Sequence, residues 1–130
     1  MKDTKRLALI ALGVAIALIS IKASAQDTSM KIVGMWYAED LDQSMVEVVE
    51  LEDGSYEGVI KSSSTASYIG HKVLYDFLYQ EGERVYKGTI HSASRDMELD
   101  GYITMEKDGR LKLTGKKFFM TRTFYWERKE

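Results

Sequence analysis

YEGVI at residues 56–60 and YKGTI at residues 86–90 repeat one pattern, in which tyrosine, glycine and isoleucine occupy alternate positions. Side chains alternate between the two faces of a β-strand, so these three residues share one face of each strand. A glycine inside a strand weakens pairing and marks a sharp bend or the close approach of another group. The pattern therefore predicts strongly curved strands whose tyrosine, glycine and isoleucine face inward.

Two later segments, LDGYI at 99–103 and LKLTG at 111–115, also place a glycine beside apolar residues on one face. A tandem duplication would repeat a phrase too, but the residues around the copies do not match. A small barrel needs such glycines where its strands bend and where large side chains from across the barrel need room. We therefore expect four glycines to face one core: Gly58, Gly88, Gly101 and Gly115.

Eight strand-like segments follow one another at a spacing of about ten residues, and no helical apolar spacing persists after residue 25. The pairs Asp53-Gly54 and Asp108-Gly109 favour tight hairpin turns, and residues 80–83 form a third candidate. An open sheet of this length would leave two exposed edges, which closure removes. The sequence predicts an all-β fold, a single antiparallel up-and-down barrel of about eight strands. The expected strands are 33–38, 45–51, 56–62, 72–79, 84–91, 98–105, 110–116 and 122–128.

The first 25 residues have the composition of a helical secretory signal peptide. Basic residues come first, residues 7–21 are almost wholly apolar, and Ala23 and Ala25 precede a cleavage site between Ala25 and Gln26. A membrane anchor is the alternative, but the apolar run is shorter than the roughly 20 residues that span a bilayer. We expect residues 1–25 to be removed on export to the periplasm or the medium. Residues 26–31 are then a flexible lead, and residues 32–130 form the barrel domain.

Composition excludes several classes of partner. The chain has a formal net charge of −2 at pH 7 and contains no cysteine, so neither disulfides nor a cysteine-borne lipid anchor is available. After residue 25 no run of basic residues is longer than two, whereas nucleic-acid binding needs clustered Lys and Arg. We expect no nucleic-acid partner and no transmembrane anchor after cleavage.

Aromatic and arginine residues near the two ends of the barrel predict a structural clasp. The first and last strands of an up-and-down barrel pair with each other. An arginine of the last strand can then lie across an indole of the first and donate to free carbonyl groups. The residues expected in this clasp are Trp36, Arg122, Trp126 and Arg128.

The inward side chains predict the wall of a binding site for a small amphipathic or lipid-like ligand. The candidate wall residues are Tyr56, Ile60, Tyr86, Ile90, Leu99 and Ile103. An eight-stranded barrel can instead be filled by its own side chains. The alternative function is an envelope module with a filled core that binds another protein. It would do so through the flap at 62–70 or through strand 72–79, whose outer face would carry Leu74 and Leu78.

Residues that carry catalysis or bind metals are sparse. His71 and His91 are the only histidines, and neither has another ligand at metal-binding spacing. There is no cysteine nucleophile and no Gly-x-Ser-x-Gly segment. The acidic clusters are typical of solvated faces. We expect no enzyme activity, no catalytic residue, no metal and no cofactor.

Several segments, in this order and spacing, carry a family resemblance: GMWY at 34–37, MVEVVELEDGSYEGVI at 45–60, IGHKVLYDF at 69–77, YKGTI at 86–90, LDGYITMEKDGRLKLTG at 99–115 and TRTFYWER at 121–128. They resemble the bacterial domain-of-unknown-function family 2147, a group of small exported proteins. The resemblance implies the barrel fold but no established activity. The loops at 62–70 and 91–101 depart from the family pattern. The Gly-x-Trp start and the closing arginine are also similar to lipocalin-like barrels, which bind small apolar ligands.

Overall fold

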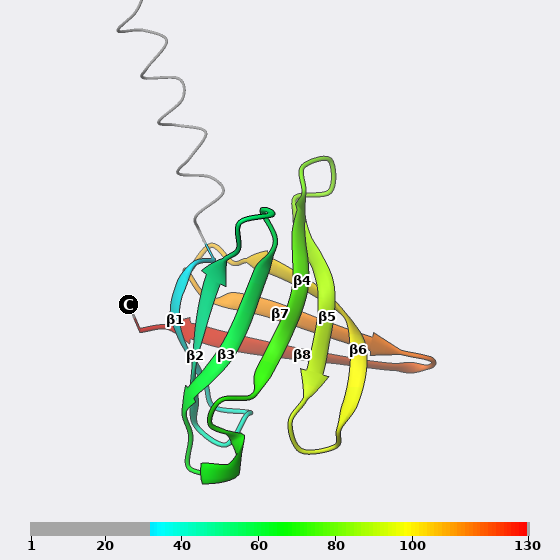
Figure 1. Ribbon diagram of the computed structural model, residues 1–130. Helices are drawn as coiled ribbons and strands as arrows, with labels where there is room; N and C mark the ends of the chain where they lie inside the picture. The colour runs from blue at the N-terminus through cyan, green and yellow to red at the C-terminus, as the bar shows by residue number, and fades with distance from the viewer. Residues whose placement is uncertain (1–31, 130) are drawn as a thin grey trace, which may run out of the picture. The chain divides into compact units, whose positions relative to one another are not determined.

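The computed structural model describes residues 32–129, which form eight β-strands and one short helical turn (Figure 1). Every expected strand is present, with its ends shifted by at most two residues. The elements are β1 (Gly34–Ala38), β2 (Ser44–Glu50), β3 (Tyr56–Ser62), the 3₁₀ turn η1 (Ala66–Tyr68), β4 (Lys72–Gln80), β5 (Val85–Ser92), β6 (Met97–Met105), β7 (Leu111–Lys117) and β8 (Met120–Arg128). The predicted signal peptide at 1–25 and the lead at 26–31 lie outside the described residues. Among residues 32–129, no helix has the length and apolar composition needed to cross a bilayer.

The strands form one closed antiparallel barrel. Each strand pairs with the next along the chain, and β1 pairs with β8 to close the sheet. The closing pair is short, with two residue pairs in register, Trp36 with Arg128 and Tyr37 with Glu127. The predicted up-and-down barrel is therefore confirmed.

One phenylalanine explains two of the inward glycines. Phe77 of β4 is fully buried, and its ring lies over the point where Gly88 of β5 pairs with Gly101 of β6. A Cβ atom built on Gly88 would lie 2.7 Å from Cγ of Phe77, and one built on Gly101 would lie 2.6 Å from Cζ of the same ring. Real side-chain atoms do not come that close, so the ring fits only because both strands carry glycine there.

The other two inward glycines make room for leucines. A Cβ atom on Gly58 would lie 2.9 Å from Cδ1 of Leu74, and one on Gly115 would lie 3.0 Å from Cδ1 of Leu99. Both leucines belong to the buried core. The prediction that all four glycines face the core is confirmed.

Strand β4 departs from the predicted alternation. The pairing of β4 with β5 changes register between Tyr75 and Leu78, and Asp76 has a positive φ of 55°. This bulge adds one residue to β4 and so reverses which side chains face inward beyond it. As a result, Leu74 before the bulge and Phe77 after it are both buried, and Leu78 is exposed. The prediction that Leu74 faces outward with Leu78 is wrong.

The connections between strands are largely as predicted. Gly54 and Gly109, in the two Asp-Gly turns, have φ values of 88° and 91°. In the β4–β5 turn the left-handed position falls on Arg84, with φ of 56°, and Gly82 keeps an ordinary φ.

The serine-rich loop between β3 and β4, expected to be a flap, is tied to the β1–β2 loop. The backbone nitrogen and Oγ of Ser64 donate to the carbonyl oxygen of Asp42 at 3.0 and 2.6 Å. Thr65 Oγ1 donates to Oδ2 of the same aspartate at 2.6 Å. The two loops therefore brace each other at one end of the barrel.

Replacing Gly101 with alanine tests this packing. The new methyl group would overlap the ring of Phe77 and Cγ1 of Ile90, which lies 2.7 Å from the Cβ position. We expect Gly101→Ala to lower the free energy of unfolding by about 1–3 kcal/mol, as overpacking generally does. Urea unfolding followed by tryptophan fluorescence measures the loss.

Gly82→Ala is the matched control, since nothing lies within 4 Å of its Cβ position and its φ is ordinary. It should change stability by no more than about 0.5 kcal/mol. In the double variant with Phe77→Leu, the alanine at 101 should cost less than it does alone. Equal stability of the two alanine variants would contradict the packing described.

Candidate functional site

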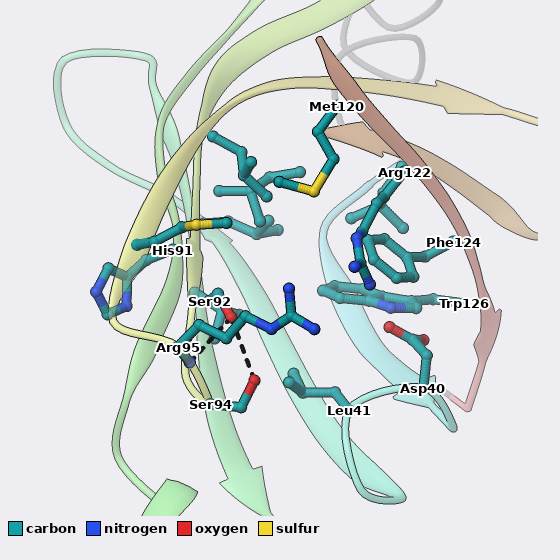
Figure 2. Close-up of a pocket in the computed structure, with 16 residues that line it drawn as sticks. Asp40, Leu41, His91, Ser92, Ser94, Arg95, Met120, Arg122, Phe124 and Trp126 are labelled. Atoms are coloured by element: carbon teal, nitrogen blue, oxygen red, sulfur yellow. Dashed lines mark hydrogen bonds between the residues drawn. The ribbon is translucent and has the colours of Figure 1, made fainter. Parts of the chain in front are cut away.

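A cavity of about 180 Å³ lies at one end of the barrel (Figure 2). In an up-and-down barrel the β1–β2, β3–β4, β5–β6 and β7–β8 connections share one end, and the cavity is at this end, here called the cavity end. Its apolar lining residues are Leu41, Val73, Leu74, Ile90, Met97, Leu99, Leu113, Met120, Phe124 and Trp126. An apolar cavity of roughly 150 Å³ is enough to hold benzene. This cavity is therefore large enough for a small apolar group.

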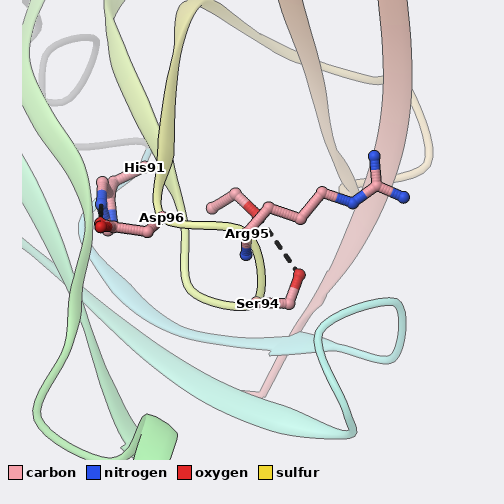
Figure 3. Close-up of polar contacts among 5 residues, drawn as sticks. His91, Ser94, Arg95 and Asp96 are labelled. Atoms are coloured by element: carbon pink, nitrogen blue, oxygen red, sulfur yellow. Dashed lines mark hydrogen bonds and ion pairs between the residues drawn. The ribbon is translucent and has the colours of Figure 1, made fainter.

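Two arginine side chains line the cavity, Arg95 from the β5–β6 turn and Arg122 from β8 (Figure 2). Arg95 extends from its turn across the cavity end toward β8 (Figure 3). Within residues 32–129 neither arginine takes part in a salt bridge. Each guanidinium thus keeps the planar set of donors that binds carboxylate or phosphate. Asp40 is the one carboxylate among the lining residues, so the cavity has a net positive charge.

Trp126 forms one side of the cavity and brings a polar atom to it. The residue is 4% exposed, and its indole Nε1 has no hydrogen-bond partner among the described residues. The carboxylate of Asp40 lies beside the indole (Figure 2). Partial burial raises the pKa of Asp40, and the nearby indole N–H, although short of hydrogen-bond geometry, opposes this rise. Because the indole N–H makes no close hydrogen bond within the described residues, it is available to donate to an acceptor atom of a ligand.

His91 borders the cavity at the end of β5. Its Nε2 lies 3.0 Å from Oδ1 of Asp96 (Figure 3), and its ring stacks on His71 with centroids 6.5 Å apart. Among residues 32–129 no group of three or more His, Asp or Glu side chains is placed to hold a metal ion. His91 is therefore part of the cavity border, whereas His71 contacts His91 without lining the cavity.

The six residues proposed as a ligand wall fall into two groups. Ile90 and Leu99 line the cavity. Tyr56, Ile60, Tyr86 and Ile103 are buried in the core but do not line it. The barrel is thus filled around the tyrosines and hollow at the cavity end, and the sequence prediction did not separate these two parts.

The tyrosines form a packed cluster remote from the cavity lining. The rings of Tyr56 and Tyr86 meet edge to face with centroids 5.4 Å apart, and Tyr79 lies 4.8 Å from Tyr86. Burial, with smaller effects of Tyr56, Tyr79 and Glu50, raises the pKa of Tyr86 to about 12. This cluster supports the fold rather than the site.

The clasp between the first and last strands involves two of its four predicted residues. The guanidinium of Arg128 lies 4.3 Å from the ring centre of Trp36 and donates to the carbonyl oxygen of Val33 at 3.1 Å. Arg122 is six residues earlier, about 20 Å along a strand, and pairs with Gly115. Trp126 faces the cavity. Arg122 and Trp126 therefore belong to the site and not to the clasp.

Sequence reasoning did not single out Arg95 and Asp40, which line the cavity, and it assigned Arg122 to the clasp although Arg122 lines the cavity. A signal for Arg122 was present, because alternation puts it on the same face of β8 as Phe124 and Trp126, which is the inner face. No such signal exists for Arg95 and Asp40. Both lie in connections, where side-chain direction follows from the fold and not from a periodic pattern.

An eight-stranded up-and-down barrel that is closed on itself and hollow at one end is the architecture of lipocalin-like proteins. The sequence profile of a bacterial family, described as "Uncharacterized protein conserved in bacteria (DUF2147)", matches residues 19–128. The chain belongs to this family, which confirms the resemblance seen in the sequence.

Comparison with solved structures supports the same architecture. The protein HP1028 from the human pathogen Helicobacter pylori, described as belonging to the lipocalin family, has a similar fold with a TM-score of 0.58 and 18% sequence identity. The similarity covers 76% of this chain and 83% of HP1028. No curated protein matches the sequence.

The tyrosine cluster predicts a loss of stability at alkaline pH. Tyr86 is neutral when protonated, and its pKa rises from 10 to about 12 on folding. Between these values the unfolded chain releases a proton that the folded chain retains. The contribution of Tyr86 to the free energy of unfolding is therefore fully present below about pH 10 and declines as the pH rises toward about 12.

Urea unfolding near pH 9 and near pH 11.5 measures this decline. Between these conditions Tyr86→Phe should lose about 2 kcal/mol less stability than the unmodified chain. Tyr125→Phe, at an exposed tyrosine of β8, should behave like the unmodified chain. If Tyr86→Phe loses as much stability as the unmodified chain, the cluster is not the source of the pH dependence.

Proposed function

We propose that this protein binds a small amphipathic molecule with an anionic head, without changing it chemically. The observation that carries the proposal is an apolar cavity of about 180 Å³ whose rim holds two arginines without a carboxylate partner. The lipocalin family, to which HP1028 is assigned, supplies the fold-level support. The predicted leader fits a role in the envelope or outside the cell.

In this proposal the apolar part of the ligand lies between Ile90, Leu99 and Leu113. Burial of one CH₂ group contributes about 0.8 kcal/mol, so six such groups contribute about 5 kcal/mol. That free energy alone corresponds to a dissociation constant of roughly 0.2 mM, before the entropic losses of binding. Apolar contacts alone therefore give weak binding, and the polar rim decides the affinity.

The head of the ligand lies near the guanidinium groups of Arg95 and Arg122. Charge-assisted hydrogen bonds from arginine to a carboxylate or phosphate are stronger than neutral ones and fix the orientation of the anion. The indole N–H of Trp126 adds a donor that lacks a partner in the described residues. A neutral head group of the same size would leave both positive charges unneutralised and would bind more weakly.

The alternative function, a filled module that binds a protein through the flap at 62–70 or the outer face of β4, has less support. The core is hollow at the cavity end, and Leu74, one of the two residues proposed for that face, is 1% exposed. Leu78 alone does not make an apolar patch of the size typical of partner sites.

Titration calorimetry with matched ligands tests the proposal. A series of straight-chain carboxylates from hexanoate to dodecanoate is compared with the alcohols of the same chain length. We expect the carboxylates to bind more tightly than the alcohols. Affinity should rise with chain length by roughly fourfold per CH₂ until the cavity is full, and then level off. If neither series binds, or if both bind equally, the proposal is wrong.

Variants of the two arginines distinguish the contribution of the ligand's anionic head from that of its apolar chain. Arg95→Gln and Arg122→Gln should each weaken carboxylate binding by about tenfold, the loss of one charge-assisted hydrogen bond. Each should leave alcohol binding almost unchanged. Arg84→Gln, in the β4–β5 turn at the other end of the barrel, is the matched control and should bind both series normally.

A further inference from the structure

The β7–β8 hairpin ends in two fully exposed phenylalanines. Lys117 and Met120 are the last pair of the β7–β8 ladder, so Phe118 and Phe119 form the loop between them. Their exposures are 93% and 105%, far above those of the other exposed large apolar residues among positions 32–129, of which the next highest is Ile69 at 51%. In Figure 1 this hairpin, orange and red, projects beyond the neighbouring strands. Phe118 and Phe119 are called the tip below.

The backbone of the tip is one that phenylalanine does not favour. Phe118 has a positive φ of 56°, a left-handed conformation in which a bulky residue is an outlier. Two-residue hairpin loops usually contain Gly, Asn or Asp for this reason. Neither phenylalanine packs into the core. The fold of residues 32–129 therefore gives no reason for an aromatic side chain at either position, which points to a role outside the fold.

The segment around the tip is strongly basic, although the chain as a whole has a net charge of −2. Residues 109–126 contain five basic residues and no acidic residue. Lys116, Lys117 and Arg122 flank the tip, and none of them takes part in a salt bridge within the described residues. Asp100 of β6 lies opposite Lys116 in register, so Lys117 and Arg122 are the less compensated charges.

We propose that the tip docks the barrel on an anionic lipid surface. Phe118 and Phe119 enter the boundary between head groups and acyl chains, and the basic residues contact the phosphates. Aromatic side chains beside lysine and arginine are the combination that favours this interface. A protein partner fits less well, because two side chains on a convex tip provide far less than the roughly 800 Å² per partner of a standard interface. A bilayer needs no complementary shape.

Docking would also orient the cavity. The β7–β8 connection is at the cavity end, and Met120, which directly follows Phe119, lines the cavity together with Arg122. A tip held in the lipid boundary therefore brings the rim of the cavity near the bilayer surface. The docking itself does not depend on any ligand, and it is tested without one.

Co-sedimentation with vesicles tests the docking. Residues 32–129 form a closed sheet with its own core, so a chain beginning at residue 26 is used. This choice keeps the apolar run at 7–21 from binding lipid itself. Circular dichroism checks that each variant is folded. We expect binding to phosphatidylcholine vesicles that contain about 30% phosphatidylglycerol, at least tenfold weaker binding to pure phosphatidylcholine, and weakening by salt.

The decisive variant is Phe118→Asn with Phe119→Gly. Asparagine tolerates the positive φ at position 118 better than phenylalanine does, and glycine adapts to any turn conformation at position 119, so the variant should melt at the same temperature or higher. Its binding to anionic vesicles should fall by at least tenfold, because the buried apolar area is lost. Lys117→Glu should also weaken binding to anionic vesicles. The matched controls Leu78→Ser and Lys107→Glu, at exposed positions away from the tip, should bind like the unmodified chain.

Two outcomes would overturn the proposal. The unmodified chain could fail to bind anionic vesicles, or the Asn-Gly variant could bind them as well as the unmodified chain does. In the first case, self-association of the unmodified chain but not of the Asn-Gly variant in analytical ultracentrifugation would assign the tip to contact between copies. Loss of carboxylate binding in calorimetry would leave the docking result unaffected, so the two proposals fail separately.

Discussion

The contact of the Phe77 ring with Gly88 and Gly101 is the constraint on which the rest of the barrel depends. The fully buried ring on β4 lies against the backbone of the next two strands, β5 and β6, and only glycine leaves that space. Ile90 also packs over Gly101, and it lines the cavity as well. The core packing therefore continues into the wall of the cavity. Gly101 packs against Ile90 and Phe77 packs against Gly101, so these two residues help to set the shape of the cavity although they do not line it.

The period-two pattern of the sequence predicted the strands, the closure and the inward glycines, because each follows from local alternation and from the need to remove sheet edges. It failed on β4, where the bulge at Asp76 turns Leu74 inward. A bulge adds one residue without a clear local signal. It also failed on the site. Which part of the barrel is hollow depends on how Phe77, Tyr56 and Tyr86 share the interior, and this balance of volumes is not visible in any single strand.

The two ends of the barrel differ in how completely their side chains are packed and hydrogen-bonded. Away from the cavity, aromatic rings meet in close contact, as the 5.4 Å separation of Tyr56 and Tyr86 shows. At the cavity end the buried indole N–H of Trp126 and Nδ1 of His91 have no hydrogen-bond partner among residues 32–129. Unsatisfied groups of this kind are unfavourable in the empty protein and become favourable when an acceptor is supplied. The proposed binding function requires this arrangement, in which a well-packed core supports a cavity whose polar groups are not all hydrogen-bonded.

Strand β8 runs from the exposed tip past the cavity to the clasp. Along its length lie Met120 after the tip, then Arg122 at the rim, Trp126 in the cavity wall and Arg128 over the indole of Trp36. The β1–β8 seam has two residue pairs in register, and the contact of Arg128 with Trp36 adds to the pairing of β8 with β1 at its end. A shift of β8 at this seam would move the rim and the tip together. The clasp therefore stabilises the barrel and also fixes the position of the arginine, the indole and the aromatic tip relative to one another.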